Sequence, residues 1–176
     1  VVVIGANALD FEGVAGILLG SVLGGSVGQG LSGIFSQGCK VIIACGTEKL
    51  IPGSILKHAQ KAGRTVNDWS MGMSCGLFPL WGEVITEQTA LELLFPITAT
   101  PIAAGGIHGG EGSSTWVLEG KKEDIQNALQ LIGTMYERVN NTDDNIKECE
   151  PGQLKCKDHL SCGWRNRERK LSWHIR

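Results

Sequence analysis

The stretch that most constrains the fold is residues 1–52, where two short apolar runs flank a glycine-dense segment. The runs read V-V-V-I at residues 1–4 and V-I-I-A at residues 41–44. Such β-branched runs are typical of parallel strands that are buried on both faces. Open α/β sheets bind ligands just past the carboxyl ends of these strands. We therefore predict a ligand site at the polar residues found there, which are Asn7, Asp10, Thr47, Glu48 and Lys49.

Strand and helix patterns alternate along the rest of the chain, which predicts an α/β fold. Further strands are expected at residues 14–19, 84–85, 97–104 and 114–118, the last two as an antiparallel hairpin. Helices are expected at residues 27–37, 54–61, 86–94 and 121–138, and irregular structure at 68–83. Residues 1–140 should thus form one domain, with a core over 1–96 and a hairpin plus helix over 97–138. A cysteine-bearing basic tail follows over 141–176.

Three short motifs follow one another in the first third of the chain. They are G-A-N-A-L-D at residues 5–10, G-G-S-V-G-Q-G at 24–30 and A-C-G-T-E-K-L-I at 44–51. Their order resembles that of G-A-D-E-x-D, K-G-x-G-G-A-L-x-x-E-K and D-E-S-K-L-V in ribose phosphate isomerase. That enzyme belongs to a superfamily with glucosamine-phosphate deaminase, coenzyme A transferases and sugar-sensing repressor domains. The resemblance implies a Rossmann-like three-layer α/β sandwich with a ligand site at these loops.

The chain departs from the isomerase motifs at the residues that carry the chemistry. Asn7 stands where the isomerase has its first aspartate, whereas Asp10 matches the second. The lysine before the glycines is absent, as is the glutamate in the following helix. Isomerisation through an enediol needs a positioned base, and the expected base is missing. The resemblance is therefore used here for the fold and for a ligand site.

A glycine-rich loop is expected at residues 24–30, just before a helix. Backbone N–H groups at the amino end of a helix can bind an anion, so Gly24, Gly25 and Gly28 are candidate ligand-binding residues. The alternative is a tight connection between a strand and a helix. The segment is neither a dinucleotide-binding fingerprint nor a P-loop.

Two further groups of residues are candidates for chemistry. Glu48 could act as an acid, base or nucleophile beside Lys49 as an anion clamp, or both could be surface charges. The segment G-G-I-H-G-G-E-G at residues 105–112 carries His108, suited to proton transfer, with Gly109 and Glu111 as ligand contacts. Its alternative is a long hairpin loop. We expect this loop and the aromatic, sulfur-rich segment 68–83 to meet the strand ends at one pocket.

Composition excludes several classes of protein. A net charge of −2 and an apolar content of 42% indicate neither a disordered chain nor a positive electrostatic potential that would attract nucleic acid. No apolar run reaches the ~20 residues of a membrane helix, and no signal peptide is evident, so a cytoplasmic protein without disulfides is expected. The tail contains Cys149, Cys156, His159, Cys162 and His174. Their spacing is not that of paired C-x2-C ligands, so no metal site is predicted.

The sequence thus predicts binding of a small anionic metabolite, a sugar phosphate or an acyl or coenzyme A compound, at glycine-rich loops. Enzymatic transfer or isomerisation, with Glu48 and His108 as catalytic groups, is one form of this hypothesis. The alternative is a non-catalytic interaction protein that uses its tail to bind a partner. A homo-oligomer is expected in either case, and no cofactor is specified.

Overall fold

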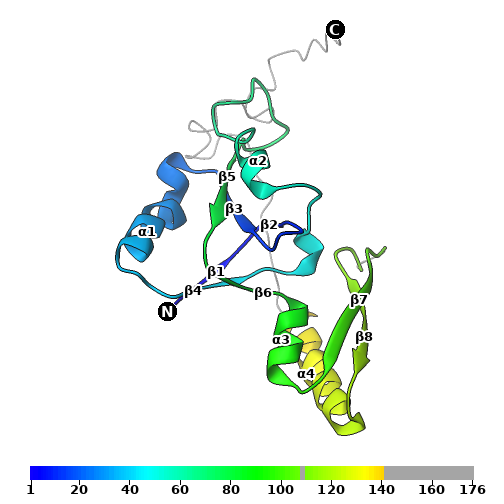
Figure 1. Cartoon of the computed structure of the whole chain (residues 1–176). Coiled ribbons are helices and arrows are strands. Elements are labelled where there is room, and N and C mark those ends of the chain that lie inside the picture. The colour runs from blue at the N-terminus through cyan, green and yellow to red at the C-terminus, as the bar shows by residue number, and fades with distance from the viewer. Residues whose placement is uncertain (108–109, 141–176) are drawn as a thin grey trace.

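The computed structural model describes residues 1–107 and 110–140. The predicted catalytic His108, the neighbouring Gly109 and the whole predicted tail lie outside the described residues. Figure 1 shows two groups of elements: the first sheets with α1 and α2, and a lower group built from α3, a hairpin and α4.

The two apolar runs that were predicted as strands pair directly with each other. β1 (Val2–Gly5), β4 (Val41–Ala44) and β6 (Glu83–Ile85) form a parallel sheet in the order β1-β4-β6. Val2 lies opposite Val41, and Ile43 lies opposite Val84. Ile43 is fully buried because it occupies the central strand and points towards the core. The prediction of parallel strands at residues 1–4 and 41–44 is therefore confirmed, but the prediction that both faces are buried is wrong for β1, whose Val3 is 70% exposed because β1 is an edge strand.

A second, antiparallel sheet lies against the first one. It contains β2 (Ala8–Leu9), β3 (Ala15–Leu19) and β5 (Gly76–Leu80) in the order β2-β3-β5. α2 (Ile55–Ala59) packs against β5. The prediction that residues 68–83 are all irregular is wrong for β5. Its Gly and Pro, both poor strand formers, obscured a strand whose position is set by pairing with β3.

The glycine loop predicted at residues 24–30 is largely helix. A short 3₁₀ turn, η1 (Val22–Gly24), leads into α1 (Gly25–Ser36). Gly24 and Gly25 have φ angles of 75° and 64°, which favour glycine at this junction. An added Cβ at Gly28 would lie 2.3 Å from the carbonyl oxygen of Leu23. Backbone geometry therefore accounts for these three glycines without a ligand.

The main core lies where the two sheets and α1 meet. Its buried members are Ala6, Leu9, Ala15, Leu31, Val41, Ile43, Cys45 and Leu80. Leu31 is the buried contribution of α1. Because residues from β1 to β5 share this cluster, residues 1–85 fold around one apolar centre.

The hairpin and its flanking helices agree closely with the sequence pattern. α3 (Glu87–Leu94) begins at the capping box that Thr86 makes with Thr89. β7 (Thr98–Ala104) and β8 (Ser114–Glu119) form the expected antiparallel hairpin, and α4 (Lys122–Asn140) follows it. Ala99 and Ala128 are fully buried in this group.

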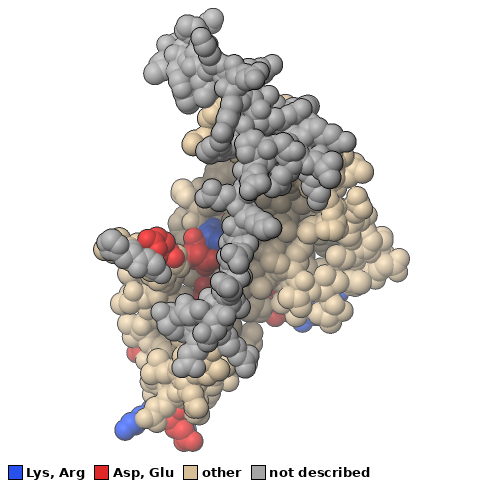
Figure 2. All heavy atoms as spheres, turned by 180° about the vertical axis from the view of Figure 1, so that it is seen from behind, with Lys and Arg blue, Asp and Glu red and all other residues tan. Residues whose placement is uncertain are grey.

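Helices combined with parallel and antiparallel sheets confirm the predicted α/β class. The strands form three separate sheets rather than one. Within residues 1–107 and 110–140, none of the helices has the length and apolarity needed to cross a membrane. The described surface in Figure 2 has few charged side chains, in small groups of mixed sign, and shows no broad basic area.

Candidate functional site

Asp10, which was predicted to bind a ligand, accepts hydrogen bonds from backbone N–H groups around it. Its side chain is only 2% exposed. Oδ1 accepts hydrogen bonds from the N–H groups of Glu12 and Val14, and Oδ2 accepts one from Ile55 at the start of α2. Burial alone would raise the pKa of Asp10, but these three bonds and the charge of His58 lower it below its usual value. Both oxygens are occupied, so the geometry gives this residue a structural role.

Asn7 also serves the local backbone. Its Oδ1 accepts a hydrogen bond from the N–H of Leu18 at 2.9 Å, and its own N–H donates to the carbonyl of Gly16 at 2.7 Å. These bonds connect the segment after β1 to β3. The side chain is exposed, but its amide oxygen is already engaged.

The other three predicted strand-end residues form a short 3₁₀ turn, η2 (Thr47–Lys49), after β4. This turn lies beside β2, because Ile51 donates to the carbonyl of Leu9 at 2.8 Å. The Lys49 Nζ atom is 3.8 Å from Oε1 of Glu48, and each side chain is about one third exposed. Neither side chain is buried, so both can reach a ligand at this edge.

Two hydrogen bonds connect η2 to the lower group of elements. The backbone N–H of Thr47 donates to Oε2 of Glu87, at the start of α3, at 2.8 Å. The hydroxyl groups of Thr47 and Ser114 lie 3.3 Å apart. In addition, a Cβ built on Gly112 would be 3.6 Å from Cγ of Glu48. Gly112, in the glycine-rich segment at residues 105–112, therefore lies near the carboxyl end of β4. The prediction of a single pocket places this segment there.

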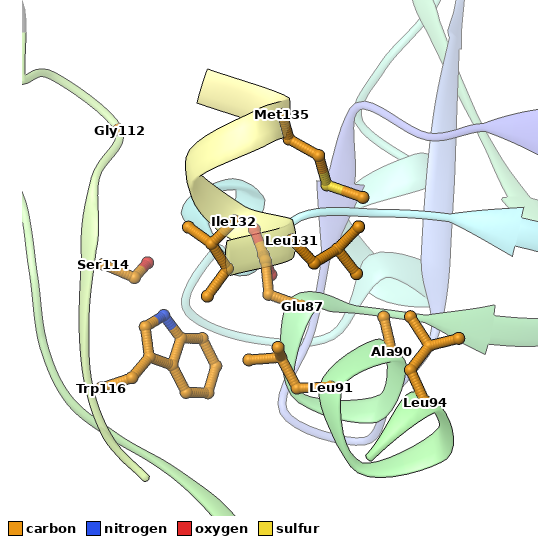
Figure 3. A pocket seen from close by; sticks show the side chains of 10 residues that line it. All are labelled: Glu87, Ala90, Leu91, Leu94, Gly112, Ser114, Trp116, Leu131, Ile132 and Met135. Carbon is orange, nitrogen blue, oxygen red and sulfur yellow. The ribbon is translucent and has the colours of Figure 1, made fainter. Parts of the chain in front are cut away.

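A pocket of 430 Å³ opens beside this junction. Figure 3 shows α3, β8 and α4 surrounding it, with side chains from all three pointing inward. Its lining comprises Glu87, Ala90, Leu91 and Leu94 from α3, Gly112, Ser114 and Trp116 from β8 and the segment before it, and Leu131, Ile132 and Met135 from α4. Ligand pockets are typically apolar with a few placed polar groups, and this pocket has that composition.

The polar end of the pocket is formed by the residues that contact η2. Glu87, Gly112 and Ser114 each line the pocket and each touch Thr47 or Glu48. One carboxylate oxygen of Glu87 is held by Thr47. Among the described residues, the other oxygen has no hydrogen-bond partner. An apolar cavity with one open carboxylate oxygen is thus the main chemical feature of this region.

Sequence reasoning missed most of the pocket lining. Glu87 follows β6 just as Glu48 follows β4, so the rule that selected Glu48 could also have selected Glu87. The lining residues of α4 gave only the signal of an amphipathic helix. That periodicity shows an apolar face but does not show whether a neighbouring element fills the space against it.

Some predicted site residues lie elsewhere. Gly24 ends η1, and Gly25 and Gly28 lie in the first turns of α1, which Figure 1 shows on the opposite side of the sheets from the hairpin. Residues 68–82 do not line the pocket; Met73 instead packs against Gly20. In the glycine-rich segment at residues 105–112, Glu111 is exposed next to Gly112. His108 and Gly109 fall outside the described residues.

Cys45 directly follows β4, before η2 in the sequence. Its thiol is buried and lies 3.7 Å from the carbonyl oxygen of Ala8, to which it donates. Burial raises its pKa, Lys49 lowers it, and Glu48 and Glu87 raise it further. The thiol is therefore protonated at neutral pH and unsuited to nucleophilic attack. Within the described part of the chain, no group of three or more His, Cys, Asp or Glu side chains could hold a metal ion.

No protein-family model, curated protein or solved structure matches this chain.

Proposed function

We propose that the protein binds a small metabolite at the carboxyl edge of the parallel sheet, with the apolar part of the ligand in the pocket. The observation that carries the proposal is the 430 Å³ cavity whose polar end contacts η2. Pockets of this size and composition accommodate small organic ligands. Lys49, about one third exposed beside Glu48, is the cation of η2 that would face an anionic group of the ligand.

Of the two ligand chemistries expected from the sequence, the lining favours an acyl compound over a sugar phosphate. Seven of the lining side chains are apolar, from Ala90 to Met135, and none is a lysine or arginine. A sugar would leave several hydroxyl groups without partners in such a cavity, at a cost in free energy. An acyl chain would instead replace water against leucine, isoleucine and methionine.

The wider fold supports the same placement. β1 and β4 are parallel neighbours, and the connection between them passes through β2, β3 and α1. We propose that this sheet is the central layer of a Rossmann-like sandwich. Ligands bind such sheets at their carboxyl edge, where η2 lies.

In the enzymatic form of the proposal, Glu48 is the acid or base. It lies next to Gly112, which lines the pocket, and beside Lys49. A catalytic carboxylate must reach the proton that it transfers, and this partly exposed side chain is free to do so. His108 would be its partner in this form.

The second candidate is the non-catalytic interaction protein. Exposed apolar side chains on the hairpin and α4 favour it: Ile102, Leu129 and Met135 are 61%, 55% and 53% exposed. Contiguous apolar surface commonly marks a contact with another protein. The homo-oligomer expected from the sequence would use this surface, and the tail would bind a partner. Sedimentation of the full chain and of a chain ending at residue 140 tests both statements.

Thermal unfolding with a ligand panel tests the leading proposal. The panel contains hexanol, hexanoate, hexanoyl-coenzyme A and ribose 5-phosphate. A ligand at 100 times its Kd stabilises the fold by about 2.7 kcal/mol, which is visible in Tm. The six-carbon compounds should raise Tm, and ribose 5-phosphate should not.

A matched pair of variants on α3 locates the binding. Leu91→Trp should fill the pocket and abolish the shift, whereas Leu93→Trp, at a residue that is 70% exposed, should retain it. The proposal fails if none of the six-carbon compounds shifts Tm, or if both variants respond like the native chain.

A further inference from the structure

The inference concerns Glu87 and rests on the ligand pocket proposed above. We infer that the ligand carries a protonated amine next to its apolar body, and that Glu87 is the residue that recognises it. An apolar amino acid, or its ester or thioester formed at the carboxyl group, has this chemistry, since it combines a free amine, an apolar body and a group of acyl type.

The first observation is the state of the Glu87 carboxylate. Oε2 accepts the N–H of Thr47 at 2.8 Å, which fixes the orientation of the group. Oε1 has no hydrogen-bond partner in the described part of the chain, and the side chain lines the pocket. In Figure 3 it appears between Ile132 and Leu131, and Ser114 is seen on the other side of Ile132. A carboxylate held in this way is an acceptor for an N–H donor from the ligand.

The second observation is the charge of the lining. Among the described residues that line the pocket, Glu87 is the one charged residue, so none of them is a cation that neutralises it. A ligand carboxylate placed next to it would be repelled, whereas an ammonium group would gain a charge-assisted hydrogen bond. Lys49 contacts Glu48 rather than the cavity, which separates the site for an anion from the site for an amine.

The third observation is the position of Trp116. Its indole ring borders the cavity opposite α3, as Figure 3 shows. Aromatic faces attract ammonium groups, and the attraction is strongest for tryptophan. The Ser114 hydroxyl, which also lines the pocket, is a second hydrogen-bond acceptor in the cavity. Three groups from two elements thus favour a cationic amine.

The test compares hexylamine with hexanol, which share one apolar chain and differ in the head group. Kd values are measured by isothermal titration on the full chain at neutral pH. Hexylamine should bind about tenfold more tightly, because hydrogen bonds to charged groups are roughly twice as strong as neutral ones. In Glu87→Gln, which retains the shape of the side chain, the ratio of the two Kd values should fall close to one. Glu123→Gln, at an exposed position outside the pocket, should leave the ratio unchanged.

The outcomes separate this inference from the proposed function. If hexanol binds and hexylamine binds no better, the amine inference is overturned while ligand binding in the pocket stands. A ratio that survives Glu87→Gln also overturns it, because the selectivity then has another source. Failure of both compounds to bind overturns the proposed function itself. The melting temperature of each variant, recorded without ligand, shows that the variant is folded.

Discussion

Asp10 and Glu87 are both carboxylates that follow a short strand, yet the structure uses them differently. Asp10, after β2, is 2% exposed and accepts three backbone hydrogen bonds. Glu87, after β6, is exposed and accepts one, with its other oxygen open beside a cavity. The position of a carboxylate after a strand therefore does not show whether it has a structural role. The number of backbone N–H groups that it accepts does show this.

The largest expected effect comes from Asp10→Ala. Three backbone N–H groups would lose their acceptor in a buried loop, and unsatisfied buried donors cost about 1–3 kcal/mol each. The free energy of unfolding should fall by about 3 kcal/mol or more. Urea denaturation measures this loss. Glu12→Ala, next to the same loop but exposed, should change stability little, and an equal loss in both variants would show that Asp10 has no special role.

The next effect separates packing glycines from ligand-binding glycines. A methyl group at Gly28 would meet the Leu23 carbonyl at 2.3 Å, so Gly28→Ala should cost about 1–3 kcal/mol, as overpacking does. Gly30 is in the same helix with nothing within 4 Å of an added Cβ. Gly30→Ala should therefore stabilise the chain by up to about 1 kcal/mol. Thermal unfolding compares the two; opposite signs are expected, and matching signs would contradict the packing account.

How far the sequence could predict this molecule differs between its parts. The parallel strands at residues 1–4 and 41–44, the helix at residues 86–94 and the hairpin carry local signals, and all four are confirmed. The strand β5 was missed because its partner β3, rather than its own residues, determines it. In the predicted glycine-rich segment at residues 105–112, Gly112 lies near Glu48 of η2, whereas His108, on which the shared-pocket prediction depended, lies outside the described residues.

The pocket could not be predicted to the same extent. Its walls come from three elements, and whether they close on one another depends on tertiary packing that periodicity does not encode. The structural role of Asp10 could not be predicted from its position after a strand. Its three backbone donors belong to residues up to 45 positions away in sequence, of which only Glu12 and Val14 are local.

A smaller effect tests the connection between η2 and the hairpin. Thr47→Val keeps the shape of the side chain and removes the hydroxyl that lies 3.3 Å from Ser114. The loss should be about 0.5–1.5 kcal/mol, the net value of one hydrogen bond. Thr115→Val, on the exposed face of β8, should be neutral in the same urea titration. Equal behaviour of the two variants would mean that this contact does not hold the elements together.

The smallest effect is a dependence of stability on pH. The pKa of Asp10 is lower in the folded chain than in the unfolded chain, so its contribution is fully present above the unfolded value. Stability should therefore decline as the pH falls below about 4, through the range where Asp10 becomes protonated. Asp10→Asn should show a shallower decline than the native chain. A slope that is identical in the two proteins would remove the carboxylate from the account.

The most direct test of the difference between Asp10 and Glu87 is an NMR titration of the isotope-labelled chain with hexylamine. The account predicts shifts of the Trp116 indole N–H and of the backbone amides of Thr47 and Ser114, which surround the open carboxylate. The amides of Glu12 and Val14, which are bonded to Asp10, should not move. Shifts that centre on the Asp10 loop, with Trp116 and Thr47 unchanged, would contradict it.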